Sequence, residues 1–152
     1  MKKILIAVFI CVVVFIIYLC FNDNNVYYLS IGDYLANGVN PYGVTDYGYA
    51  DYIKNYLNES GKLEVFVENA ENGKRMTDLI NDINMNKKIN VAGKEKTFQN
   101  VLIKADLITI SIGSNDLLGN VVFNNDFSVN DLYKKLDQVL VYYDELFKLV
   151  RK

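Results

Sequence analysis

Two short apolar runs, each ending at a glycine followed by polar side chains, constrain the fold of this chain more than any other feature. The first lies in the stretch from Val26 to Gly38, where a run of β-branched and aromatic residues stops at Gly32-Asp33. The second is Leu107 to Ile112, which stops at Gly113-Ser114-Asn115-Asp116. Such runs predict buried strands. Because sites in open α/β sheets lie at the carboxyl ends of strands, we expect both polar loops at one edge of a parallel sheet.

The remaining apolar residues recur at helical or strand spacing. The resulting order of strand, helix, strand, helix, strand, helix predicts a doubly wound α/β domain with three layers, a parallel sheet between helices. The predicted elements are a helix over 47–57, a strand over 63–67 with its exit loop at 68–73, helices over 76–83 and 98–105, and a long helix over 131–150 after a loop at 124–130; residues 84–96 are predicted to be a polar excursion.

The long helix has an apolar stripe along one face. Ser128, with Asp131 three residues later, has the pattern of a capping box at its start. We interpret the stripe as the side that packs on the sheet; the alternative is a surface for a partner helix. The stripe consists of Leu132, Leu136, Val139, Leu140, Tyr143, Leu146, Phe147 and Val150.

Residues 4–21 form an uncharged run of 18 residues directly after Lys2 and Lys3. As a helix this run would be about 27 Å long, enough to span a bilayer with slight thinning. The basic side is N-terminal, which favours a cytoplasmic amino terminus. We expect an uncleaved, single-pass anchor in the cell membrane at 1–22, with a domain at 23–152 on the extracellular side. A cleaved signal peptide or a lipoprotein site at Cys20 are alternatives, but the residues before Cys20 are not small.

Composition excludes several classes of function. The sequence contains no histidine, the commonest metal ligand and general base. Both cysteines, Cys11 and Cys20, lie in the N-terminal run, so the domain has no disulfide framework. The net charge is −2 and the lysines are interspersed with acidic residues, so no basic stripe indicates nucleic acid. We therefore expect no metal, no cofactor and no nucleic-acid partner.

Three motifs resemble sequence blocks of the SGNH or GDSL hydrolases, which are esterases, lipases and O-acetyl hydrolases. Ile31-Gly32-Asp33-Tyr34-Leu35 resembles the first block, Gly-Asp-Ser-Leu, and Gly73 stands where the second block has its glycine. Gly113-Ser114-Asn115-Asp116 matches the third block, Gly-x-Asn-Asp. Each motif alone is compatible with an ordinary turn. Their order at the ends of three predicted strands favours the family, whose fold is a flavodoxin-like parallel sheet of strand order 2-1-3-4-5.

The resemblance also implies roles for these residues. In that family the block-one serine attacks the ester, and a histidine from a late Asp-x-x-His block acts as its base. Gly73, Asn115 and the backbone N–H of residue 34 would be oxyanion donors. The nucleophile position, however, holds Tyr34, whose phenol lies farther from the backbone and stays protonated without a base. The site-shaping residues would be Gly32, Asp33, Gly113 and Asp116.

The sequence reaches Lys152 without an Asp-x-x-His block, so we expect a domain that is incomplete at its C-terminus. We interpret it as an SGNH-hydrolase-like domain, inactive as written, whose ligands would be acyl or acetyl esters. The alternatives are a non-catalytic surface module that binds a glycan or acyl group, and a truncated or split gene product. Lys74 and Arg75, beside Gly73, are interpreted as a solvated turn rather than an anion site.

The strand at Leu107 to Ile112 would be central in the implied sheet, yet no strand is predicted after it. Its open edge would be a template for pairing. We expect marginal stability, because three strands bury a small core, and self-association or capture of a complementing chain at that edge. The helix over 131–150 is the one predicted element that would cover the edge.

Overall fold

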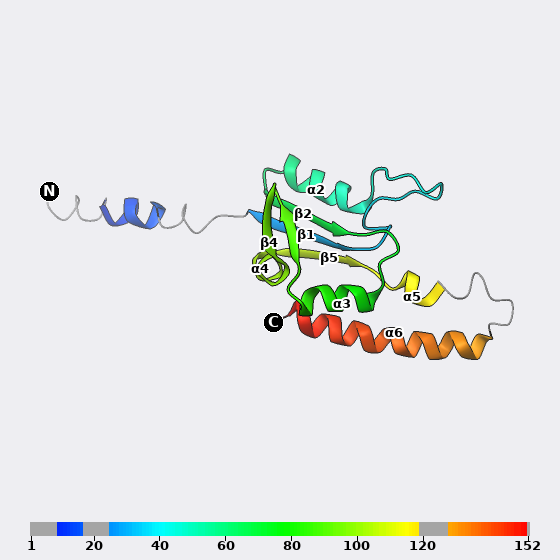
Figure 1. Cartoon of the computed structure of the whole chain (residues 1–152). Helices are drawn as coiled ribbons and strands as arrows, with labels where there is room; N and C mark the ends of the chain where they lie inside the picture. The colour runs from blue at the N-terminus through cyan, green and yellow to red at the C-terminus, as the bar shows by residue number, and fades with distance from the viewer. Residues whose placement is uncertain (1–8, 17–24, 119–127, 152) are drawn as a thin grey trace.

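The structure is a computed structural model that describes residues 9–16, 25–118 and 128–151 (Figure 1). Three parallel strands form its central sheet in the order β2-β1-β5. These strands are β1 (Val26–Gly32), β2 (Leu63–Ala70) and β5 (Leu107–Ser111). The α/β class and the predicted order of the first three strands are thereby confirmed.

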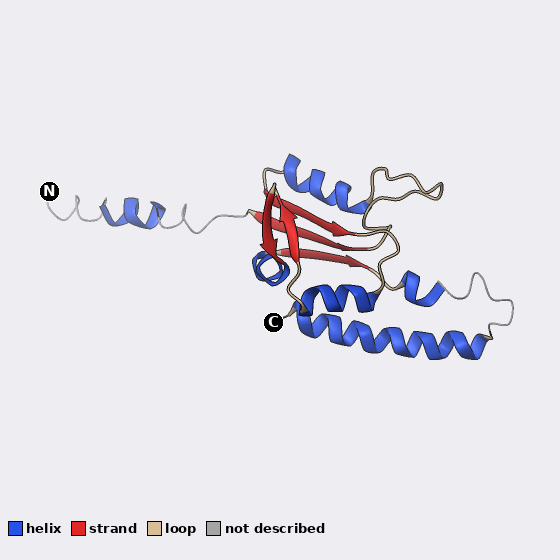
Figure 2. Ribbon diagram, in the orientation of Figure 1, coloured by secondary structure: helices blue, strands red, loops and turns tan. Residues whose placement is uncertain are grey.

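Helices lie on both sides of this sheet (Figure 2). One side carries α2 (Tyr49–Glu59), and the other carries α3 (Met76–Asn84) and α4 (Phe98–Lys104). The long helix α6 (Val129–Val150) packs mainly against α3 and against the short helix α5 (Ser114–Leu118). Along the chain, β1 is followed by α2, β2 by α3 and β5 by α5.

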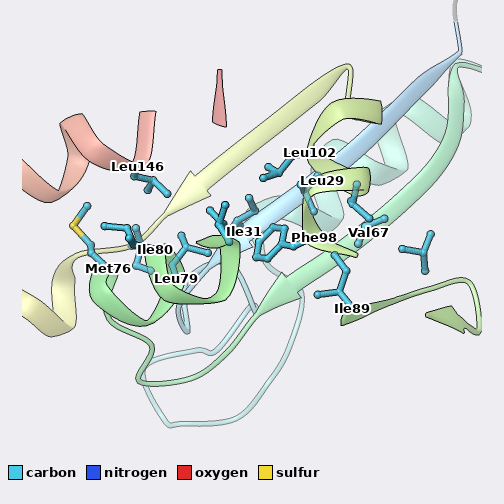
Figure 3. Packing of buried hydrophobic residues seen from close by; sticks show 14 of the residues in the cluster. Leu29, Ile31, Val67, Met76, Leu79, Ile80, Ile89, Phe98, Leu102 and Leu146 are labelled. Atoms are coloured by element: carbon cyan, nitrogen blue, oxygen red, sulfur yellow. The ribbon is translucent and has the colours of Figure 1, made fainter. Parts of the chain in front are cut away.

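The main core lies between the sheet and helices α3 and α4 (Figure 3). Leu29 and Ile31 of β1 are fully buried there, together with Phe98 of α4 and Leu79 of α3. Burial of each such side chain contributes roughly 1.5–3 kcal/mol. All of β1 after Val26 is buried, as expected for the middle strand of a sheet with helices on both faces. This rigid strand fixes the position of the loop that follows it.

Two predictions about the middle of the chain are wrong. Residues 68–70 continue β2 rather than forming its exit loop. The predicted excursion contains an antiparallel hairpin of β3 (Lys88–Val91) and β4 (Lys94–Thr97). The turn between them places Ala92 and Gly93 at positive φ, 50° and 81°. The sequence did not predict this hairpin, because β4 has no apolar residue and Ala92 occupies a turn position that favours glycine or asparagine.

The long helix begins as predicted but does not pack as predicted. The side chain of Ser128 caps it, with Oγ accepting from the Asp131 N–H at 3.2 Å. Val139 and Leu146 are buried, whereas Leu136 is 39% exposed and Leu140 is 57% exposed. The side of the stripe that includes Val139 and Leu146 therefore packs, largely on α3, and the side that includes Leu136 and Leu140 is exposed to solvent.

The N-terminal run is described only over residues 9–16, which are helical. The rest of the predicted span at 4–21 lies outside the described residues. Within the described ranges, no helix combines the length and the apolar character needed to cross a membrane.

β5 is bonded to a single strand, β1, in the part of the chain that the structure describes. Its residues are uncharged and half-buried, and an uncharged edge invites strand pairing. We expect self-association that increases with protein concentration and that Leu107→Lys weakens, because an edge charge opposes pairing. Leu118→Lys, on α5, is the matched control. Sedimentation velocity measures the effect; a wild-type chain that is monomeric at every concentration contradicts it.

Candidate functional site

Three loops meet at the carboxyl edge of the sheet, joined by backbone hydrogen bonds. The Asp33 N–H, just after β1, donates to the carbonyl of Ser111 at the end of β5, 2.9 Å away. The Glu71 N–H, just after β2, donates to the carbonyl of Gly32 at 3.0 Å. The predicted convergence of the polar loops at one edge is therefore confirmed.

Gly32 is required by this close approach. A Cβ atom placed on Gly32 would lie 2.1 Å from the carbonyl oxygen of Ser111. That oxygen is backbone and cannot move aside without breaking the bond from Asp33. Any larger residue would therefore force the β1 and β5 loops apart.

The carboxylate of Asp33 ties the first loop to the third. Asp33 is fully buried. Its Oδ1 accepts from the Leu35 N–H at 3.1 Å, and its Oδ2 accepts from Ser114 Oγ at 2.6 Å. Hydrogen bonds to an ionised group are about twice as strong as neutral ones. Asp33 thus connects the loop that holds residue 34 to the first turn of α5.

Two further side chains tie the third loop to the second. Asn115 Nδ2 donates to the carbonyl of Lys74 at 3.0 Å. Asp116 Oδ2 accepts from the Met76 N–H at the start of α3, also at 3.0 Å. An asparagine amide has two N–H donors, so the bond to Lys74 fixes one and leaves the other for a ligand.

A buried cation, the side chain of Lys74, holds the turn at Gly73 in place. Gly73 has a φ of +80°, which suits glycine, and it is exposed. The neighbouring Lys74 is only 5% exposed, and its Nζ lies 2.6 Å from Asp82 of α3 and 3.4 Å from Glu71. The interpretation of Lys74 as part of a solvated turn is therefore wrong. Its ion pair fastens the second loop to α3.

Tyr34 lies in the first loop, directly after Asp33, and its side chain is half-buried. In the described part of the chain its hydroxyl forms no hydrogen bond. Beside this loop, next to Leu35, is a hollow of about 360 Å³. Ser111 and Tyr49 are among its lining residues. The Tyr49 hydroxyl is itself buried and has no protein partner among the described residues. The other residues that line the hollow include Val39 and Tyr47.

Tyr143 of α6 lies at the site, although the sequence did not predict it there. Its hydroxyl donates to the carbonyl of Ile112 and lies 3.4 Å from where a Cβ on Gly113 would be. Burial raises the pKa of this phenol above 10.0, and the carboxylates of Asp33 and Asp116 raise it further. In the sequence Tyr143 is one of eight apolar-stripe positions, and nothing there distinguishes its hydroxyl.

The structure thus brings together Gly32, Asp33, Gly113, Asn115 and Asp116. Gly73 precedes Lys74, whose carbonyl accepts the hydrogen bond from Asn115. Over residues 9–16, 25–118 and 128–151, no three His, Cys, Asp or Glu side chains are grouped as a metal ion would need.

Ser114→Ala tests the link between the first and third loops. The substitution leaves the buried Asp33 carboxylate without one of its two donors, so we expect a loss of about 1.5–3 kcal/mol in the free energy of unfolding. Thr45→Ala, at an exposed loop position, is the control and should change stability by less than about 0.5 kcal/mol. Urea unfolding measures both. Equal, small effects would show that the link does not matter.

Tyr143→Phe tests the contact between α6 and the third loop. A pKa that is raised in the folded state contributes stability that is complete below pH 10.0 and is lost as pH rises through the folded value. We expect the variant to be about 1 kcal/mol less stable at neutral pH. Above pH 10.0 its stability should decline less steeply than that of the wild type. Parallel alkaline slopes in urea unfolding would contradict this account.

Comparison with known proteins agrees with the geometry. The sequence model of the family described as GDSL-like Lipase/Acylhydrolase matches residues 28–151, which include all three loops. A search of curated proteins finds no match. Because the matched region covers most of the chain, the protein belongs to the GDSL-like lipase/acylhydrolase family.

Proposed function

We propose that this chain binds acyl or acetyl ester groups through the oxyanion-stabilising part of a GDSL-type site and does not hydrolyse them by itself. Gly73, Asn115 and the backbone N–H of residue 34 are the oxyanion donors in this proposal. Tyr34 occupies the nucleophile position without acting as a nucleophile. Gly32, Asp33, Gly113 and Asp116 shape the three loops.

The observation that carries the proposal is the hydrogen bond of 3.0 Å from Asn115 Nδ2 to the Lys74 carbonyl. It places the asparagine amide beside the Gly73 turn, so that two donors from different loops are held without a ligand. Preorganised donors of this kind are the ones that stabilise an oxyanion, at roughly 3–4 kcal/mol each in a water-excluded site.

The hollow beside Leu35 supports an acyl group as the ligand. Val39, Tyr47 and Leu35 give it apolar walls, and its volume of about 360 Å³ suits a small molecule. An ester would place its chain in this hollow and its carbonyl oxygen toward Asn115.

We further propose that the domain is displayed outside the cell on an anchor at residues 1–22. The uncharged run and the two lysines before it support this. The second candidate function is a surface module for glycans, favoured by the tyrosines and hydroxyls around the hollow. A truncated or split gene product would bind neither ligand.

Ester hydrolysis separates the proposal from retained catalysis. We expect the chain to hydrolyse p-nitrophenyl acetate no faster than buffer does, because Tyr34 lacks a base. Tyr34→Ser alone should recover little, since a positioned general base contributes ~10²–10⁴-fold. Robust hydrolysis by the wild type that Asn115→Ala abolishes would contradict the proposal.

Thermal unfolding tests binding. Hexanoate at ten times its dissociation constant should stabilise the chain by about 1.4 kcal/mol, which raises the melting temperature by roughly 4–6 °C. Asn115→Ala should remove this shift, and Asn100→Ala on α4 should keep it. N-acetylglucosamine serves as the glycan probe. A shift with the sugar alone would favour the glycan module, and no shift with either would contradict ligand binding.

A further inference from the structure

The end of the domain opposite the candidate site has an apolar groove. There the last turns of α3, α4 and α6 meet around a hollow of about 230 Å³. Ile103, at its rim, is 77% exposed, and Met85, just after α3, is 72% exposed. Exposed apolar residues that gather around a groove mark an interaction surface. The groove is lined by Ile83, Asn84, Gln99, Leu102, Ile103, Leu149 and Val150.

The N-terminal run joins the domain at this same end. The Val26 N–H, at the start of β1, donates to the carbonyl of Lys62 at 2.6 Å. The Tyr27 N–H donates to the carboxylate of Asp106, two residues after α4, at 2.9 Å. The start of β1 and the end of α6 both lie toward this end of the domain, with α4 between them, and the site loops lie at the other end (Figure 1). In the sequence only four residues, 22–25, separate the uncharged run 4–21 from β1, so the run is joined to this end of the domain.

Exposed charges of both signs are found here. Lys62 and Lys104 are exposed and form no ion pair among the described residues. Arg151 is also exposed, with its guanidinium over the ring of Phe147. Glu59 and Glu64 are exposed acidic residues at this end, and the exposed Asp106 carboxylate accepts from the Tyr27 N–H. The rim is thus apolar at its tip and carries charges of both signs around it.

We propose that this end of the domain, comprising Met85, Ile103, Lys62, Lys104 and Arg151, rests on the lipid surface of the membrane. The inference builds on the proposed N-terminal anchor and not on the acyl site. Exposed apolar side chains enter the boundary between headgroups and acyl chains, while lysine and arginine bind anionic headgroups. The groove lies at the end where the uncharged segment joins the domain. A lipid contact explains this position, whereas a protein partner could bind at any face.

This placement turns the candidate site away from the membrane. The seven residues of β1 separate the two ends by about 20 Å. The site then faces ligands in the surrounding medium or on other surfaces, rather than lipids of the bilayer that holds the chain.

Site-directed fluorescence in vesicles tests the contact with the full chain. Ile103→Cys, in a background of Cys11→Ser and Cys20→Ser, is labelled with bimane and reconstituted in vesicles of equal parts phosphatidylcholine and phosphatidylglycerol. Tyr42→Cys in the same background is the control, because Tyr42 is 91% exposed in the loop near the candidate site. Lipids that carry a quencher on the acyl chain report the contact of each label with the bilayer.

We expect blue-shifted emission and strong lipid quenching for the label at 103 and little of either at 42. Equal quenching at the two positions would overturn the proposal. So would a blue shift at 103 without lipid quenching, which would mean that protein covers the groove. Failure of the chain to float with vesicles would also overturn it. None of these results bears on hexanoate binding, so the two proposals fail separately.

Discussion

The buried carboxylate of Asp33 is the interaction on which the site depends. A buried carboxylate without donors costs several kcal/mol, so Asp33 holds its neighbours in the geometry that supplies them. Those neighbours are the Leu35 N–H in its own loop and Ser114 Oγ in the third loop. From Ser114 the chain continues into Asn115, which binds Lys74 in the second loop. The buried charge of Asp33 holds Ser114, and the next two residues, Asn115 and Asp116, bind the second loop and the start of α3. These bonds fix the relative positions of the three loops.

The two halves of an ester-hydrolysing site have separate structural requirements. The oxyanion donors that we propose are backbone N–H groups and one amide, and the hydrogen bonds that join the loops at the sheet edge would also position them. A nucleophile and its base need particular side chains, and these 152 residues have Tyr34 at the first position and no histidine. In the proposed site, the fold that holds the donors therefore does not depend on a nucleophile or a base. A binding function can persist on such a scaffold.

Sequence patterns predicted the parts of the fold that depend on local composition. β1 and β5 are short β-branched runs closed by glycine, and both were found within a residue of their limits. The β3–β4 hairpin was missed because its outer strand is entirely polar and its register is set by packing of Ile89 and Val91 under the sheet. The outward half of the α6 stripe was misread because helical spacing defines a face but not the element against which it packs.

The site shows the same division. The glycines and Asn115 were predicted from motif order, and they lie in the three loops at one edge of the sheet. Lys74 and Tyr143 do not, since their partners, Asp82 and Ile112, are eight and 31 residues away in sequence. A lysine beside a glycine turn is usually solvated, and only the tertiary structure shows an acidic partner within reach.

We propose that Gly73, Asn115 and the N–H of residue 34 act as one preassembled set of donors. Nuclear magnetic resonance of the nitrogen-15-labelled chain, titrated with hexanoate, tests it most directly. The account predicts that the Gly73 and Tyr34 backbone signals and the Asn115 side-chain amide signals shift together along one saturating curve. Shifts confined to other residues, with these three unchanged, would contradict it.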